Sequence, residues 1–236
     1  MITRTTPSPA AERTAAGVRR MFDRVAPRYD LANTVFSLGQ DRLWRRAAAQ
    51  ATSLEDGEVA VDVACGTGLL AGELARLAPG AQVLGLDFSW EMVRRAPDSV
   101  RPPLGVADAL RLPLADASVD VITIAFGLRN LPEPAVGLLE FRRVLRPGGR
   151  LVVCEFSHPT VPVLRQVYGR YLTKLMPLAA RRLASDPEAY EYLARSIGAW
   201  PDQDGLARWL TGAGFERVRW RNLSGGIVAL HRGAVA

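Results

Sequence analysis

Short apolar runs alternate with amphipathic segments along most of the chain. The runs are rich in valine and isoleucine, which is typical of strands buried on both faces of a parallel sheet. They cover residues 59–64, 83–86, 103–107, 119–125 and 150–156. Helical spacing of leucines in 69–77, and helical segments at 90–95 and 133–145, fall between these runs. The alternation predicts an α/β fold with a mostly parallel sheet and helices on both faces.

The pattern changes near the C-terminus. A predicted helix over 203–211 is followed by two apolar runs, 215–220 and 226–231, with no helical segment between them. Two strands joined by a short connection pair antiparallel, because a parallel pair needs a longer crossover. The sheet is therefore expected to end in an antiparallel pair.

Two further regions, near the N-terminus and after the fifth strand, have helical patterns. Residues 17–50 are predicted to form a helical cap over the sheet, and the polar residues 1–16 before them are predicted to be disordered. We predict a single domain over 17–236, with a helical insertion or lid at 160–200. Within it, 161–184 is amphipathic and basic without an acidic residue. This segment suits a membrane surface or a lid over an apolar substrate, and equally a helix packed on the core.

Composition narrows the class of protein. At 236 residues, with 48% hydrophobic and 23% charged residues, the chain has the length and balance of one globular domain. Its net charge of +6 fits an anionic partner, but Lys174 is the one lysine among 30 basic residues, a bias that also follows from base composition. Cys65 and Cys154 lack metal-binding spacing and are expected to be reduced thiols. No apolar run reaches the roughly 18 residues of a membrane span.

A glycine-rich turn joins the first predicted strand to its helix. Gly66 and Gly68 let the backbone turn sharply and approach a ligand, because no Cβ intervenes. Asp87 follows at the end of the second strand, where a carboxylate accepts hydrogen bonds from ribose hydroxyls. Position 71 is alanine, which a dinucleotide-binding turn also allows. The turn therefore indicates an adenosine-containing ligand without excluding a dinucleotide.

Two more acids favour one alternative. Asp62 lies inside the first strand and Asp108 follows the third. With the glycine turn and Asp87, they resemble the motif series of class I S-adenosylmethionine-dependent methyltransferases. The antiparallel end of the sheet separates that group from ordinary dinucleotide folds. The resemblance implies a Rossmann-like sheet of seven strands, the last antiparallel.

Several blocks together resemble one family, the quinone-ring C-methyltransferases of menaquinone and ubiquinone biosynthesis. The resemblance covers residues 18–233. The later of its sequence blocks, in the order given below, are specific for this family. The matching stretches are FDRVAPRYDLAN, SLGQDRLWRR, VDVACGTG, ITIAFGLRN, RVLRPGGRLVVCEFSHP, YLARSIGAWPDQ and NLSGGIVALHRG.

The resemblance implies transfer of a methyl group from S-adenosylmethionine to a ring carbon of a prenylated quinol, with no metal. A family position that is usually serine is Ala125 here. The candidate residues for binding the donor are Asp62, Gly66, Thr67, Gly68, Asp87, Phe88, Asp108, Ala109 and Ala125. Ala32, Thr34 and Asp41 stand where the family more often has Met, Asp and His, and these departures are expected to affect the substrate pocket.

This reaction requires an activated ring. A reduced quinol, and more so its anion, pushes electron density onto the carbon to be methylated, whereas an oxidised quinone is electron-poor. A group must polarise or deprotonate the hydroxyl, and a proton must later leave the methylated carbon. We expect Arg129 and Asn130, after the fourth strand, to orient or stabilise the quinolate, with Tyr29 or Asp30 as the base. Of the two histidines, His231 is expected to be structural and His158 is left open.

Other functions fit parts of the pattern. The arginine-rich composition indicates a bacterium of high GC content and favours demethylmenaquinol as substrate. A benzoquinol of the ubiquinone pathway and a soluble secondary metabolite are the alternatives. An RNA methyltransferase is disfavoured because the arginines are dispersed and form no cluster with aromatic residues. We expect a cytoplasmic protein, peripheral at the inner face of the membrane, with no nucleic-acid partner.

Overall fold

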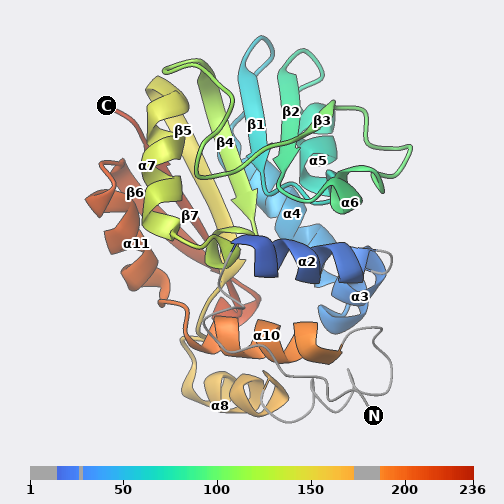
Figure 1. Ribbon diagram of the computed structural model, residues 1–236. Coiled ribbons are helices and arrows are strands. Elements are labelled where there is room, and N and C mark those ends of the chain that lie inside the picture. Colours follow the sequence, from blue (N-terminus) through green and yellow to red (C-terminus); the bar gives the residue numbers. More distant parts are fainter. Residues whose placement is uncertain (1–14, 27–28, 173–186) are drawn as a thin grey trace.

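A twisted sheet of seven strands forms the centre of the computed structural model, which describes residues 15–26, 29–172 and 187–236. The strand order is β3-β2-β1-β4-β5-β7-β6 (Figure 1). Strands β1 to β5 pair in parallel, and β7 is antiparallel to both of its neighbours, as predicted. The bounds are β1 Val59–Val63, β2 Gln82–Asp87, β3 Leu104–Val106, β4 Val119–Ala125, β5 Leu145–Phe156, β6 Glu216–Leu223 and β7 Val228–Ala234.

Helices cover both faces of the sheet. In Figure 1, α7 and α11 lie on the face toward the viewer, and α4 and α5 lie behind it. The α-helices are α2 Ala15–Val25, α3 Tyr29–Phe36, α4 Gln40–Thr52, α5 Leu69–Leu77, α6 Trp90–Val93, α7 Pro134–Val144, α8 Pro162–Arg170, α10 Pro187–Gly198 and α11 Gln203–Gly212. Short 3₁₀ turns follow β4 and β6, at Leu128–Asn130 (η2) and Ser224–Gly226 (η4).

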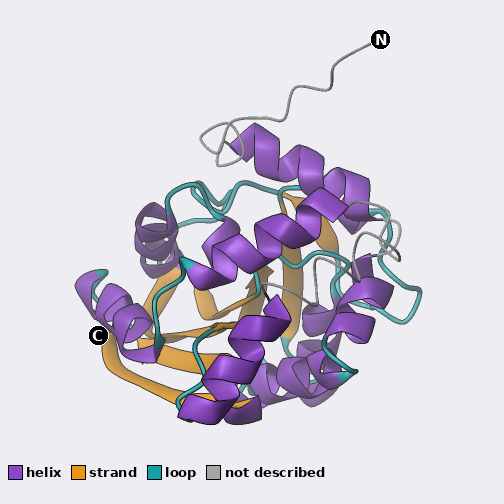
Figure 2. Cartoon of the chain, turned by 90° about the horizontal axis from the view of Figure 1, so that it is seen from below, coloured by secondary structure: helices purple, strands orange, loops and turns teal. Residues whose placement is uncertain are grey.

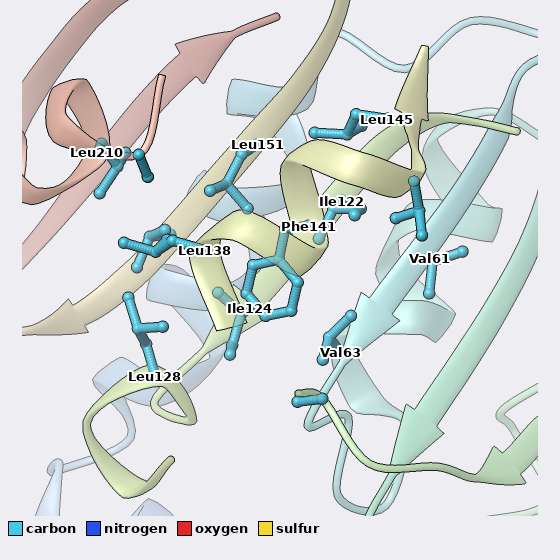
Figure 3. Close-up of a cluster of buried hydrophobic side chains, with 14 of the residues drawn as sticks. Val61, Val63, Ile122, Ile124, Leu128, Leu138, Phe141, Leu145, Leu151 and Leu210 are labelled. Atoms are coloured by element: carbon cyan, nitrogen blue, oxygen red, sulfur yellow. The ribbon is translucent and has the colours of Figure 1, made fainter. Parts of the chain in front are cut away.

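The strands are buried on both faces, which explains their nearly continuous apolar sequences. On one face, Leu138 and Phe141 of α7 pack against Ile122 and Ile124 of β4 (Figure 3). On the other face, α4 and α5 pack against the alternate strand positions, such as Val121. Fully burying a side chain of this size is worth about 2 kcal/mol, so the two layers fix the sheet on which the site is built.

A layer of helices lies across the carboxyl ends of the strands. Figure 1 places α2, α3, α8 and α10 there, and Figure 2 views the same helices from below. The pattern predicted α2 and α4 but not α3, because Asp30, Asn33 and Thr34 interrupt its apolar spacing. An acid in the first turn of α3 favours the helix through its dipole. The predicted disordered segment lies almost wholly outside the described residues, as do residues 173–184 of the basic segment.

Candidate active site

Two adjoining cavities open at the carboxyl ends of the parallel strands. The larger has a volume of about 410 Å³ and lies between α2, α4, α8 and α10. The smaller, of about 90 Å³, lies between α2 and the segments that follow β2, β3 and β4. Phe22, Phe126 and Asn130 line both cavities. Ligand sites of open α/β sheets occur at this edge, so the pair forms the candidate active site.

The glycine turn after β1 forms one wall of the smaller cavity. Ala64, Gly66 and Gly68 have φ angles of 52°, 59° and 79°, so the chain takes a left-handed conformation at every second residue. A Cβ on Gly68 would lie 2.8 Å from a methyl carbon of Leu104. Glycine is required there both for its backbone angle and for space. The turn brings backbone groups to the cavity edge, as the sequence predicted.

Asp87 fixes the shape of this turn. Its two carboxylate oxygens accept hydrogen bonds from the backbone N–H groups of Gly66 and Ser89, each at 2.8 Å. Burial raises the pKa of the Asp87 carboxyl, and these hydrogen bonds oppose the effect. Each oxygen keeps a lone pair for a further donor, such as a ribose hydroxyl.

Six of the nine residues predicted to bind the donor line the smaller cavity: Gly66, Asp87, Phe88, Asp108, Ala109 and Ala125. Asp108 also accepts a hydrogen bond from the backbone N–H of Leu110 at 2.8 Å, which sets the loop after β3. At Ala125 the methyl side chain offers no polar group, so this wall contacts a ligand through apolar atoms.

The other three predicted residues lie behind this lining. Asp62 is 1% exposed and accepts a hydrogen bond from the hydroxyl of Thr123 at 2.7 Å. Burial raises the pKa of Asp62 to about 7. Gly68 precedes the first turn of α5, and the Thr67 hydroxyl donates to the carboxylate of Asp30 at 2.9 Å. These residues support the turn, and none of them lines either cavity.

The N-terminal helices close over the turn through side-chain contacts. Besides the bond from Thr67 to Asp30, the Ser89 hydroxyl donates to Asp23 at 2.5 Å. The guanidinium of Arg19 lies 5.4 Å from the centre of the Phe88 ring. Asp30, a predicted base, is therefore held at the donor-side turn. The side chain of Tyr29, the other predicted base, lies outside the described residues.

Arg129 is held by a buried ion pair in the wall of the larger cavity. Its Nη1 donates to Glu155 Oε1 and to the carbonyl of Phe126, both at 2.7 Å. Its guanidinium stacks on Phe156, 5.0 Å from the ring centre. The Nε–H of Arg129 is buried and has no hydrogen-bond partner among the described residues. Burial raises the pKa of Glu155, and the charge of Arg129 opposes the effect.

Asn130 sits between the two cavities. Its Nδ2 donates to the carbonyl of Phe126 at 3.0 Å, and its Oδ1 accepts from the hydroxyl of Tyr192 at 3.2 Å. Arg129 and Asn130 thus both line the larger cavity, and Tyr192 of α10 contacts Asn130 there. Tyr192 was not among the predicted site residues, although it is the first residue of the stretch YLARSIGAWPDQ, on which the family resemblance partly rests.

The rest of the larger cavity is mainly aromatic and aliphatic. The rings of Trp44, Phe126 and Phe156 form its floor, with centroids 4.9 to 6.3 Å apart. Asp41 lies at one edge and pairs with Arg45 at 2.5 Å. Burial raises the pKa of Asp41, but the Arg45 charge and hydrogen bonds to its carboxylate outweigh this and leave the pKa below its usual range.

Two of the positions at which this chain departs from the family pattern meet at that edge. The Thr34 hydroxyl donates to Asp41 at 3.3 Å, and Ser37 donates to it at 3.0 Å. Thr34 and Asp41 thus form one polar group, and Asp41 itself lines the larger cavity.

Both histidines have structural contacts outside the cavities. His231 is buried, with Nε2 at 2.8 Å from the carbonyl of Gln203, in agreement with the structural interpretation. His158 Nε2 lies 2.8 Å from the carbonyl of Trp200. Within the described part of the chain, no cluster of three or more histidines, cysteines and acids could hold a metal ion. No helix in that same part is long and apolar enough to cross a membrane.

Known proteins resemble most of the chain. A demethylmenaquinone methyltransferase of Mycobacterium sp. (strain JLS) is 54% identical over 214 residues, which cover 91% of this chain and 92% of that protein. A demethylmenaquinone methyltransferase of Corynebacterium kroppenstedtii is 51% identical with the same coverage.

Solved structures share the fold at low identity. An S-adenosylmethionine-dependent methyltransferase from Thermotoga maritima has a TM-score of 0.68 at 20% identity, covering 92% of this chain and 99% of its own. A phosphoethanolamine N-methyltransferase from Haemonchus contortus, solved with S-adenosylhomocysteine, has a TM-score of 0.62 at 13% identity, covering 92% of this chain and 60% of its own.

The sequence model of the ubiE/COQ5 methyltransferase family matches residues 10–235, and the chain belongs to that family.

Proposed function

We propose that this methyltransferase transfers the methyl group of S-adenosylmethionine to a ring carbon of demethylmenaquinol, forming menaquinol. The observation that carries the proposal is the Arg129–Asn130 pair, in the wall of a large apolar cavity that adjoins the cavity at the glycine turn. The names of the relatives that are about half identical over most of the chain support the same substrate.

The residues around the smaller cavity fit the donor. The carboxylate of Asp87 can accept from ribose hydroxyls, and Phe88, Met92 and Ala109 provide apolar contacts for a base. Gly66 has no side chain, so the backbone of the turn itself borders the cavity at this position. When bound, S-adenosylmethionine supplies an electrophilic methyl group on a sulfonium.

The chain's own residues activate and orient the ring. The guanidinium of Arg129, desolvated beside Phe156, favours the anionic form of a quinol hydroxyl and so raises electron density on the neighbouring carbon. Asn130 keeps one amide N–H for the same oxygen, since its other N–H donates to Phe126. After transfer, a proton leaves the methylated carbon and the ring regains aromaticity. Asp30 or Tyr29 is the proposed base, and Asp30 would exchange its bond with Thr67 for this role.

The prenyl tail finds an apolar channel in the same cavity. Its wall on the side of α8 and α10 is formed by Leu164, Val167, Leu172, Leu193 and Ile197. On α8, Val163 and Val167 are 71% and 57% exposed, and Arg165 and Arg170 lie on the same helix. We propose that this surface contacts the inner face of the membrane, from which a prenylated quinol must be taken.

Methyl transfer from labelled donor to defined acceptors tests the proposal. The purified protein is incubated with methyl-labelled S-adenosylmethionine and a prenylated naphthoquinol, its oxidised quinone or a prenylated benzoquinol. Label is expected in the naphthoquinol under reducing conditions alone. Label in the benzoquinol alone would move the protein to the ubiquinone pathway. Absence of label from every acceptor, despite donor binding, would refute a quinol substrate.

A variant pair tests the role of Arg129. Arg129→Ala is expected to lower kcat by at least about 100-fold, a typical loss for removing a charge-stabilising group, while the Kd of the donor changes little. Arg208→Ala, on an exposed face of α11, is the matched control and should behave as the natural protein. Unchanged turnover of Arg129→Ala would remove this residue from the reaction.

A further inference from the structure

A second polar group, made of residues other than Arg129 and Asn130, borders the larger cavity. Trp44 Nε1 donates to the hydroxyl of Ser224 at 2.9 Å, and that hydroxyl donates in turn to Oε1 of Gln40. Gln40 and Trp44 line the cavity, whereas Ser224 lies behind them. Residues 40 and 224 are far apart in sequence, and the fold brings them together from α4 and the turn after β6.

This arrangement orients the Gln40 amide. The indole of Trp44 only donates, so Ser224 accepts from it and has its own proton for Gln40. Because the amide oxygen of Gln40 receives that proton, its NH₂ group is left for another acceptor. Among the described residues no group accepts from it, and Gln40 borders the cavity.

The turn that carries Ser224 is strained and tightly packed. Ser224, Gly225 and Gly226 have φ angles of 48°, 68° and 94°, and a serine in this region costs of order 1 kcal/mol or more. A Cβ on Gly226 would lie 3.1 to 3.2 Å from backbone atoms of the segment before α8, the nearest being Pro159 Cα at 3.1 Å. Strain held by such packing fixes the Ser224 hydroxyl, and with it the Gln40 amide.

A chain of contacts links this group to the catalytic pair. Arg129 stacks on Phe156, Phe156 packs against Trp44 with ring centroids 6.3 Å apart, and Trp44 bonds to Ser224. Arg129, Phe156, Trp44 and Gln40 all line the larger cavity, so a ring bound there has both the Arg129 guanidinium and the Gln40 amide in its surroundings. A quinol has two oxygens on opposite sides of its ring, and each can accept a hydrogen bond from one of these two donors.

We propose that the amide of Gln40 donates a hydrogen bond to the second quinol oxygen, the one remote from Arg129, and that Ser224 and Trp44 act as positioning residues for Gln40. This inference rests on the proposed quinol substrate and deepens it. The second oxygen does not carry the charge that drives methyl transfer. A contact to it is made equally before and during the reaction, so its loss should raise KM more than it lowers kcat.

The proposed hydrogen bond can be removed either from the protein, by substitution of Gln40, or from the substrate, by omission of the second hydroxyl. Gln40→Leu is compared with the natural protein on a prenylated naphthoquinol and on the prenylated naphthol that lacks the second hydroxyl. Dissociation constants for both compounds are measured by quenching of tryptophan fluorescence, and turnover is measured on the quinol. Gln50→Leu, on an exposed position of the same helix, is the matched control.

The expected result is a loss of affinity for the quinol of about fivefold to tenfold in Gln40→Leu, with a change below about twofold for the naphthol. Ser224→Ala should show a smaller loss of the same selectivity. Equal losses for both compounds would make Gln40 merely structural and overturn the inference, as would no loss for either. If the natural protein binds the donor but does not methylate the quinol, the proposed function itself fails, which is a different result.

Discussion

Replacing Glu155 with glutamine tests the ion pair that holds Arg129. The Glu155 side chain is 1% exposed and that of Arg129 is 6% exposed. The carboxylate accepts from Arg129 Nη1, from the Arg129 backbone and from the Phe156 backbone. A glutamine has one oxygen and one NH₂, so a donor would face another donor and the Arg129 charge would stay uncompensated. Breaking a buried pair in this way costs about 3 to 5 kcal/mol.

Urea unfolding followed by circular dichroism measures this cost. Glu155→Gln is expected to lose about 3 kcal/mol of unfolding free energy, equivalent to a fall in Tm of roughly 10 °C for a chain of this length. The double variant Arg129→Met with Glu155→Leu removes both charges and should regain most of the stability, because apolar pairs of similar volume replace buried ion pairs well. Methyl transfer should stay lost in the double variant.

Either of two results would refute this reasoning. A Glu155→Gln protein within 1 kcal/mol of the natural stability would mean that another group compensates the Arg129 charge. A double variant as unstable as the single one would mean that packing, not charge, sets the cost.

Three further substitutions probe the turn after β1 and its supports. Thr67→Val removes the bond to Asp30 and should speed amide hydrogen exchange in α2 and α3, while exchange in β4 stays unchanged. The folded protein holds the Asp62 proton more tightly than the unfolded chain, so the contribution of Asp62 to stability should fall by up to about 4 kcal/mol as pH rises from about 4 to about 7, and Asp62→Asn should remove this contribution from the measured pH dependence. Gly68→Ala and Gly148→Ala share a φ of 79°, but only the first adds a clash, so thermal unfolding should show Gly68→Ala losing about 1 to 3 kcal/mol more.

The sheet was predictable because the sequence of each central strand is almost entirely apolar, which indicates burial on both faces. Runs such as Val119–Ala125 are apolar at nearly every position, and their order of succession with helices implies parallel pairing. The helix α3 was missed because Asp30, Asn33 and Thr34 interrupt the apolar spacing of its sequence. Beta-strand β5 was predicted to start at residue 150, but it already pairs at Leu145, because a bulge absorbs Pro147, Gly148 and Gly149.

The residues of the candidate site likewise include some that could be predicted from the sequence and some that could not. The residues on the turn after β1 and at the ends of β2 and β3 were predictable, since short motifs fix them locally. Gln40, Ser224 and Tyr192 were not, because their contacts join segments 62 to 184 positions apart along the chain. Hydrophobic periodicity reports which face of an element is buried and has no information on which distant partner covers it.

Of the three side chains that line both cavities, Phe22 is the one that comes from the N-terminal helix α2. The helix is also held to the donor-side segment by Asp23 and Arg19. A ligand in either cavity that favours this position of α2 lowers the free energy needed to bind in the other. Thermodynamic linkage then requires the donor and the quinol to raise each other's affinity by the same factor. The N-terminal helix thus couples ligand binding in one cavity to ligand binding in the other.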